Sequence, residues 1–185
     1  MPAIHSFNSS SPMNPEIRAE RTRDFAIIRQ LNQAAFGQDA EAKLIDLLRP
    51  GHAFIPELSL VALLDGVIVG HILFTRIRIR HEKGKTFDSL ALAPMAVLPE
   101  HQRKGLGGRL VREGLARAAG LGHRSVIVLG HEAYYPRFGF QPASKWNIRP
   151  PFEVPDSVFM ALELTPGALT NVQGTVQYPK EFELV

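Results

Sequence analysis

The sequence predicts a mixed α/β domain built on a mostly antiparallel sheet. Two apolar segments, residues 58–64 and 67–79, flank an Asp-Gly dipeptide, which favours a tight hairpin turn. Farther along, an apolar strand at 89–98, a helix at 105–119 and a second strand at 125–129 follow one another. A strand, helix and strand in this order normally join two parallel strands. Hairpins combined with one such crossover indicate a mixed sheet flanked by helices.

Composition limits the class of protein. Hydrophobic residues make up 45% of the 185 residues and charged residues 21%, which is ordinary for a globular protein. We expect one domain over 16–185, preceded by a flexible leader over 1–15 that is rich in Ser, Asn and Pro. The absence of cysteine excludes disulfides, thiolate metal sites and an acyl-cysteine intermediate. The formal charge of +3 permits an anionic partner without choosing one.

The expected location is the cytoplasm. The leader lacks the basic start and the apolar run of about 7–15 residues that mark a secretory signal. The longest apolar stretch, residues 58–74, contains the Asp-Gly turn signal, so two strands explain it better than a membrane helix. We therefore expect neither a membrane span nor a membrane partner.

Two helices are predicted before the main sheet. Residues 16–22 indicate a short first strand, and Asp24 is a candidate cap for a helix whose apolar residues recur at helical spacing as far as Ala35. A second helix is expected at 40–48, where a Pro-Gly pair provides the stop.

The strands after the hairpin turn carry two further signals. Arg76, Arg78 and Arg80 alternate with apolar residues, so these arginines are expected to face solvent. Pro94 interrupts the next strand, and because proline cannot donate to a sheet ladder it predicts a bulge or an edge. A short helix is expected at 132–137 and a late strand at 158–164.

The turn that joins the interrupted strand to the long helix predicts an anion site. Its glycines let the backbone approach a ligand, and the free amides of a helix's first turn, together with the helix dipole, point at a negative charge. Basic side chains at the same place suit a pyrophosphate. The candidate residues are Gln102, Arg103, Lys104, Gly105, Leu106, Gly107 and Gly108.

Three further roles for these glycines fit less well. The glycines could serve only to make a tight turn, although the preceding strand and the basic residues argue against that. A dinucleotide-binding fingerprint beginning at Gly105 needs glycine or alanine where Leu110 stands. A P-loop needs Ser or Thr after a Gly-Lys pair, and none follows here.

The segment resembles the phosphate motif of the GNAT superfamily of N-acetyltransferases. In that superfamily, the motif Gln/Arg-x-x-Gly-x-Gly/Ala follows a strand ending in a Val-x-Pro-like sequence. The resemblance extends over about residues 17–140, and the tail around 159–164 and 174–179 is similar to the YhbS-like branch. The matching residues are Met95-Ala96-Val97-Leu98-Pro99, then Gln102-x-x-Gly105-x-Gly107, and finally Tyr134-Tyr135-Pro136-Arg137-Phe138-Gly139-Phe140.

The resemblance implies a fold, a cofactor and roles for particular residues. It implies a GNAT-type fold whose bulged strand, at Met95, Ala96 and Val97, offers backbone groups to the pantetheine arm of acetyl-CoA. An amide of Ala96 or Val97 is then the candidate oxyanion donor. It also places Tyr135 near the leaving sulfur, where a protonated phenol can serve as the acid. The alternative for Tyr135 is a packing tyrosine whose hydroxyl bonds to the backbone.

The general base departs from the family pattern, because many family members carry a glutamate on the cofactor strand and residues 89–97 contain no carboxylate. His131 and Glu132 follow the 125–129 strand at the correct end of the sheet and are the candidates. The alternative is an exposed, solvated pair. His71 within a strand is expected in the core, and His101 on a loop surface. No spacing of His, Asp and Glu suggests a metal site.

The expected activity is direct transfer of an acetyl group from acetyl-CoA to a primary amine of undetermined identity, with a homodimer left open. One alternative is a non-catalytic acyl-CoA sensor that uses the same pocket. A second is a nucleic-acid-binding protein that uses Arg76, Arg78 and Arg80, although aromatic residues do not interleave with them. We therefore expect no nucleic-acid partner.

Overall fold

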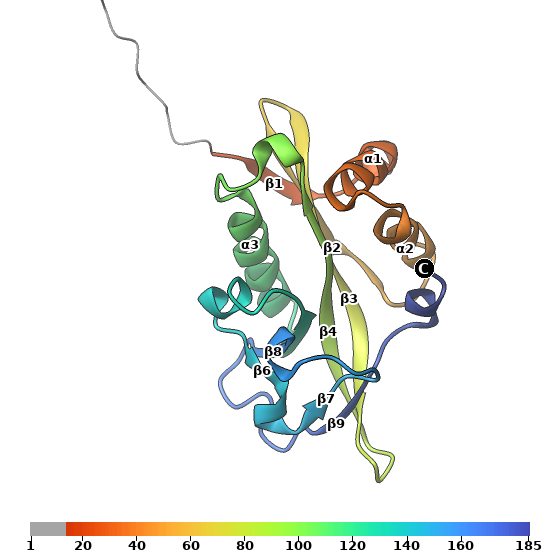
Figure 1. The fold of residues 1–185 in the computed structure, drawn as a ribbon, viewed down its shortest axis with the longest axis vertical. Helices are drawn as coiled ribbons and strands as arrows, with labels where there is room; N and C mark the ends of the chain where they lie inside the picture. Colours follow the sequence, from red (N-terminus) through yellow and green to blue (C-terminus); the bar gives the residue numbers. More distant parts are fainter. Residues whose placement is uncertain (1–13) are drawn as a thin grey trace, which may run out of the picture.

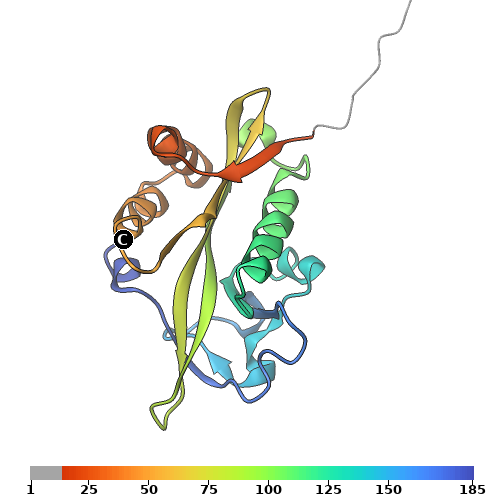
Figure 2. The same cartoon turned by 180° about the vertical axis from the view of Figure 1, so that it is seen from behind.

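The structure, a computed structural model, describes residues 14–185, so the expected leader falls outside it except for its last two residues. One twisted sheet forms the middle layer; α3 lies on one side of it and α1 with α2 on the other (Figure 1, Figure 2). No helix among the described residues is long and apolar enough to cross a membrane. The elements are β1 Glu16–Ala19, α1 Phe25–Phe36, α2 Ala40–Leu48, β2 Phe54–Leu64, β3 Val67–Arg80, β4 Thr86–Val97, α3 Leu106–Gly120, β5 Ser125–Leu129, β6 Gln141–Pro142, β7 Ile148–Arg149, β8 Phe159–Glu163 and β9 Gly174–Gln177.

The sheet is mixed, as predicted. Its strands follow the order β1-β2-β3-β4-β5-β8-β6, and β9 pairs with β3 and with β7. Neighbours are antiparallel except in the β4–β5 and β7–β9 pairs, which are parallel. The β2–β3 hairpin turns at Asp65 and Gly66, which both adopt positive φ, as a tight two-residue turn requires. The exposure of Arg76, Arg78 and Arg80 is confirmed.

Strands β4 and β5 meet over a short distance and then separate. Their ladder contains the pairs Leu90 with Val126 and Ala91 with Ile127. Among the described residues, strand β4 continues to Val97 without a ladder partner on that edge, while β5 pairs with β8 along its whole length. The backbone groups of residues 92–97 on this edge are therefore left for another partner.

The bulge predicted from Pro94 is present in β4. Phe74 of β3 faces Leu92, whereas Ile72 faces Met95, so β4 has one more residue than β3 across this interval. One extra residue exchanges the two faces of a strand. Both Leu92, before the bulge, and Met95, after it, pack into the core cluster beneath α3, although their numbers differ in parity.

Helix α3 packs very closely on the sheet because of one glycine. A Cβ added at Gly114 would lie 2.2 Å from the ring of Phe74 on β3, a distance that no real contact reaches. Leu110 and Val111 of the same helix are fully buried against the sheet. This contact fixes α3, and with it the position of the helix's first turn.

Several expectations need correction. The first strand ends at Ala19, so the predicted range 16–22 was too long. The Asp24 carboxylate does not cap α1; it accepts hydrogen bonds from the Arg18 side chain at 2.6 Å and the Arg21 amide at 2.7 Å, and so closes the preceding turn. The segment 132–137 forms a 3₁₀ helix shifted to Tyr135–Phe138. The sequence patterns did not predict β6 and β7, or β9 as a strand.

Candidate active site

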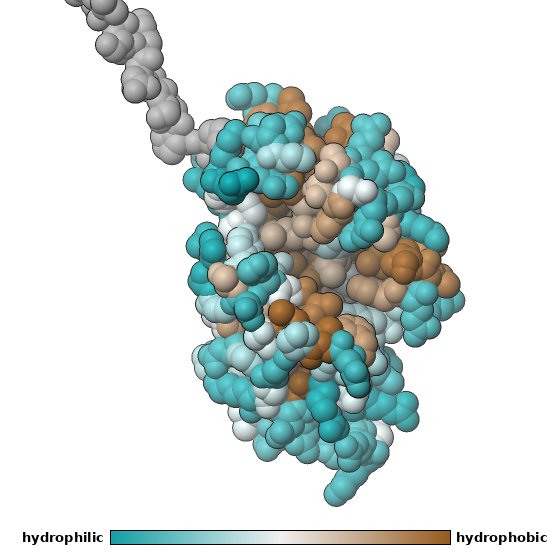
Figure 3. All heavy atoms as spheres, viewed as in Figure 1, coloured by the Kyte–Doolittle hydropathy of each residue, from teal (hydrophilic) through white to brown (hydrophobic). Residues whose placement is uncertain are grey.

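A cavity of about 740 Å³ lies where β4 and β5 separate and α3 begins. Seen from the same side as Figure 1, the surface is hollowed between α3 and the α1–α2 pair, with apolar atoms on the floor of the hollow (Figure 3). The cavity is lined by Met95, Val97, His101, Gln102, Arg103, Gly105, Leu106, Gly107, Gly108, Arg112, Gly130, His131, Tyr134, Tyr135, Arg137 and Phe138.

The turn before α3 is shaped by its own backbone. The Gln102 side chain donates to the carbonyl of Val97 at 3.0 Å and so ties the turn to the end of β4. Arg103 and Gly105 then adopt positive φ, of 59° and 84°, which reverses the chain into the helix. No side chain in the described part of the chain caps the helix. The amides of its first turn therefore remain free to bind an anion at the cavity wall.

Gly107 keeps this wall open. A Cβ at Gly107 would lie 2.8 Å from the hydroxyl oxygen of Tyr134 and 3.6 Å from the methyl carbon of Met95. A larger residue would therefore push into side chains that line the same cavity. Position 107 requires glycine because neighbouring side chains approach its backbone closely, whereas position 105 requires glycine because its φ is positive.

Tyr135 presents a protonated hydroxyl to the cavity. Its ring packs edge-on against Tyr134, at 5.1 Å between centroids, and against Phe140, at 5.6 Å. Gly130 makes room for it, since a Cβ there would lie 2.2 Å from the ring. Burial, and then the neighbouring Tyr134, raise the pKa of Tyr135, so the phenol stays protonated at neutral pH. Its hydroxyl makes no hydrogen bond within residues 14–185, which argues against a packing role alone.

The cavity wall is basic. Arg103, Arg112 and Arg137 belong to the lining, and no aspartate or glutamate does among the described residues. The Arg112 guanidinium lies over the Phe138 ring, 5.1 Å from its centroid, and that of Arg137 lies 4.6 Å from the Tyr134 centroid. Aromatic rings thus hold two of the cations at the wall. Such a cavity suits a polyanionic ligand.

Most of the predicted site residues come together here. Met95, Val97, Gln102, Arg103, Gly105, Leu106, Gly107, Gly108, His131 and Tyr135 all line the cavity. Three predicted residues are absent from the lining. The side chain of Ala96 packs on the opposite face, beneath α1 and α2, and Lys104 and Glu132 are exposed.

Sequence reasoning missed four lining residues, which are His101, Arg112, Gly130 and Arg137. His101 lines the cavity and is not a plain surface residue. Arg112 lies two turns into α3, so helical spacing from Gly105 could have placed it on the cavity side. Arg137 lies within the aromatic motif itself. Gly130 gave no local signal, because only the folded position of Tyr135 explains it.

The candidate bases differ in position. His131 lines the cavity, and its Nδ1 accepts the Ala133 amide at 3.3 Å. Glu132 is exposed outside the lining. Within residues 14–185 no three His, Asp or Glu side chains are grouped to hold a metal ion.

The fold and this cavity define an N-acetyltransferase. The chain belongs to the acetyltransferase (GNAT) family, whose pattern matches residues 25–140. It is 42% identical over 134 residues to the uncharacterized N-acetyltransferase YjhQ of Escherichia coli K12, over 72% of this chain and 74% of that protein.

Two solved structures show the same fold. The GNAT family N-acetyltransferase YhbS from Escherichia coli, in complex with CoA, has a TM-score of 0.86 and 32% identity, covering 95% of each chain. A GNAT family acetyltransferase from Brucella melitensis, in complex with acetyl-CoA, has a TM-score of 0.74 and 36% identity, covering 92% of this chain and 99% of the other. The resemblance to the YhbS-like branch is confirmed.

Proposed function

We propose that the protein transfers an acetyl group from acetyl-CoA directly to a primary amine. The observation that carries this proposal is the convergence of three kinds of unpartnered group on one basic cavity. These are the first-turn amides of α3, the free edge of β4 and the hydroxyl of Tyr135. The related structures that contain CoA and acetyl-CoA support the same cofactor for this chain.

The proposal gives the cofactor one orientation in this cavity. Its pyrophosphate accepts hydrogen bonds from the amides of Leu106, Gly107 and Gly108, and Arg103 adds positive charge at the same place. The pantetheine arm then runs along the edge of β4 at residues 95–97, where the backbone lacks a strand partner. This course directs the thioester toward Tyr135. Lys104 lies outside the lining and has no direct part in this arrangement.

The reaction needs three proton or charge assignments. The amine nitrogen attacks the thioester carbon, and an amide of Ala96 or Val97 stabilises the resulting oxyanion. The carbon–sulfur bond then breaks, and the Tyr135 hydroxyl gives its proton to the leaving thiolate. His131 takes the proton that the amine loses, directly or through water. The products are an N-acetylated amine and CoA with a free thiol.

In this proposal the amine approaches the thioester through the hollow that the surface shows between α3 and the α1–α2 pair (Figure 3). This approach leaves the α3 side of the cavity to the cofactor. The fold does not select the acceptor, because the same scaffold can serve many substrates. A polyamine, an aminoglycoside, an amino acid and a protein amine are all compatible with it.

A turnover screen tests the proposal. Acetyl-CoA is incubated with the protein and a panel of polyamines, aminoglycosides, amino acids and peptides, and free thiol is detected together with the mass of each amine. We expect thiol release that depends on one class of amine, with an equal amount of acetylated product. Tight acetyl-CoA binding without turnover across the panel would favour the non-catalytic acyl-CoA sensor. Failure to bind acetyl-CoA would exclude both functions.

A further inference from the structure

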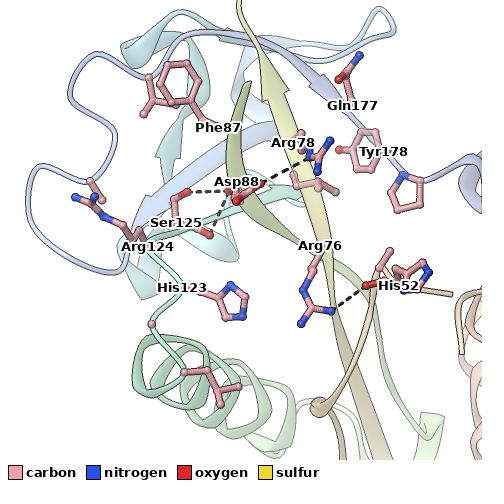
Figure 4. Close-up of a pocket in the computed structure, with 18 residues that line it drawn as sticks. His52, Arg76, Arg78, Phe87, Asp88, His123, Arg124, Ser125, Gln177 and Tyr178 are labelled. Atoms are coloured by element: carbon pink, nitrogen blue, oxygen red, sulfur yellow. Dashed lines mark hydrogen bonds and ion pairs between the residues drawn. The ribbon is translucent and has the colours of Figure 1, made fainter. Parts of the chain in front are cut away.

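A second cavity, of about 880 Å³, lies at the other end of the β4–β5 pair. It is bounded by β3, the start of β4, the loop that follows α3 and the C-terminal segment after β9 (Figure 4). It shares no lining residue with the cofactor cavity. Its side chains therefore need an explanation that acetyl transfer does not supply.

Arg76 is held in place within this cavity before any ligand arrives. Its Nη1 donates to the carbonyls of His52, at 2.9 Å, and of Phe54, at 3.0 Å. No carboxylate among residues 14–185 forms an ion pair with it. The remaining N–H groups of the guanidinium are thus free to donate, and the side chain loses little conformational freedom when they do.

His123 faces Arg76 across the open space. In Figure 4 the imidazole and the guanidinium point toward the same space from opposite sides. Burial and then Arg76 lower the pKa of His123, while Asp88 acts in the opposite direction. The ring makes no hydrogen bond within the described chain, so its N–H is also free. Two side chains that each keep free N–H donors therefore face each other.

The rest of the lining adds two further arginines and an apolar wall. Arg78 contacts Asp88 at 3.7 Å, but these side chains are 66% and 95% exposed, so water weakens the pair and Arg78 stays available. Among residues 14–185, Asp88 is the acidic residue of the lining. Arg124 points away from the open space in Figure 4 and contributes less. Phe87 and Val172 supply apolar surface.

We infer that this cavity binds a small organic anion, whose phosphate or carboxylate oxygens lie between Arg76 and His123 and within reach of Arg78. The apolar part of the ligand packs on the Phe87 and Val172 side. Tyr178 completes the polar side, because its hydroxyl points toward Arg78 in Figure 4 and burial raises its pKa to about 12, which keeps it a donor. This site is independent of the proposed acetyl transfer.

The test is an NMR titration of the full chain with phenyl phosphate, and separately with benzoate, at constant ionic strength and with CoA present to occupy the other cavity. We expect saturable shifts at His123 and at the Arg76 and Arg78 side chains, with one site per chain. The bound anion should raise the pKa of His123, since an opposite charge beside the ring favours its protonated form. The stronger of the two probes identifies the anionic group.

Variants give the test its specificity. His123→Gln should weaken binding of the stronger probe at least about tenfold, and Arg78→Gln about threefold, because Arg78 is more exposed. Arg76→Gln should abolish saturable binding. Arg23→Gln, an exposed arginine outside the cavity, is the matched control and should change nothing. Equal affinities in the folded His123 and Arg78 variants, an unmoved His123 pKa, or binding that CoA abolishes would each overturn the inference.

Discussion

The α1–α2 face of the sheet holds a buried, paired charge, whereas the α3 face presents free donors at a cavity. On the α1–α2 face, Glu20 is 3% exposed and receives two hydrogen bonds from Arg49, at 2.9 and 3.1 Å, while His71 is fully buried and bonded to Ser59 at 2.9 Å. On the α3 face, the helix amides and the Tyr135 hydroxyl have no protein partner in the described chain. Satisfied charges stabilise the domain, whereas donors left free mark the place for a ligand.

The largest expected effect is on the α3 face, at Tyr135. Tyr135→Phe keeps the ring and its edge-on contacts but removes the proton donor for the thiolate. General-acid removal typically costs about 10²–10⁴-fold in rate. Once an acceptor is known, we expect kcat to fall at least about a hundredfold, with CoA affinity within about threefold of the parent.

Tyr134→Phe is the matched control, because it removes a second hydroxyl from the same cavity. It should leave kcat within about threefold. Near-parent kcat for Tyr135→Phe, under conditions in which chemistry limits the rate, would show that water or another residue protonates the sulfur.

The buried charge on the α1–α2 face should make the stability of the fold sensitive to acid. Burial alone would raise the pKa of Glu20, but the neighbouring His71 and the hydrogen-bonded Arg49 outweigh it and lower the pKa to about 2. A lowered carboxyl pKa stabilises the fold above the unfolded value and loses that effect as pH falls toward the folded value. Between about pH 4.5 and 2 the free energy of unfolding should therefore drop by about 3 kcal/mol.

Urea unfolding at several pH values measures this loss. Glu20→Gln should flatten the pH dependence between pH 4.5 and 2, whereas Glu57→Gln, at an exposed position outside the network, should keep it. The pKa of His71 is lowered, chiefly by burial, so protonation of His71 adds acid destabilisation below about pH 6.5 in both variants. A parental slope in Glu20→Gln would remove this carboxylate from the explanation.

His131 sharpens the comparison, because it is the candidate base that lines the open cavity. His131→Gln should lower kcat/KM at neutral pH at least about tenfold, and the loss should shrink as pH rises and more amine is already neutral. Glu132→Gln should stay within about threefold. The reverse ranking of the two variants would assign the base to Glu132.

Gly107 tests whether close approach to the backbone is needed. Gly107→Val should weaken CoA binding at least about tenfold, or roughly 1.4 kcal/mol, because its side chain meets Tyr134 and Met95. Gly120→Val, in the same helix, has no neighbour within 4 Å of its added Cβ and serves as the control. Calorimetry on both folded variants decides; equal affinities would place the phosphates elsewhere.

The smallest effect is expected from single charges at the turn. Arg103→Gln should weaken CoA binding about threefold and flatten its dependence on salt, because the side chain lines the cavity. Lys104→Gln should change neither quantity, as its side chain lies outside the lining. An unchanged salt slope for Arg103→Gln would make both residues bystanders.

Local patterns in the sequence predicted much of this molecule. The Asp-Gly hairpin, the helix at 40–48 and the glycine turn before α3 depend on neighbouring residues, so they could be predicted. The bulge at Pro94 could be predicted because proline has no amide hydrogen to donate to a sheet ladder. By contrast, the short strand β9 depends on pairing with β3, and Gly130 has no local signature. The pairing of Glu20 with Arg49 joins residues 29 positions apart, which no periodicity reports.

The bulge divides strand β4 into two parts that turn residues of different parity toward α3. Up to Leu92 its even-numbered residues face α3, and from Met95 onward its odd-numbered residues do. Removing one residue between them would turn Ala96 toward the cofactor cavity and Met95 and Val97 toward α1 and α2. A substitution in this strand changes the contacts of one residue. A change in its length exchanges the faces, and so the contacts, of every residue that follows in the strand. A length change between Leu92 and Met95 is therefore the alteration this strand tolerates least.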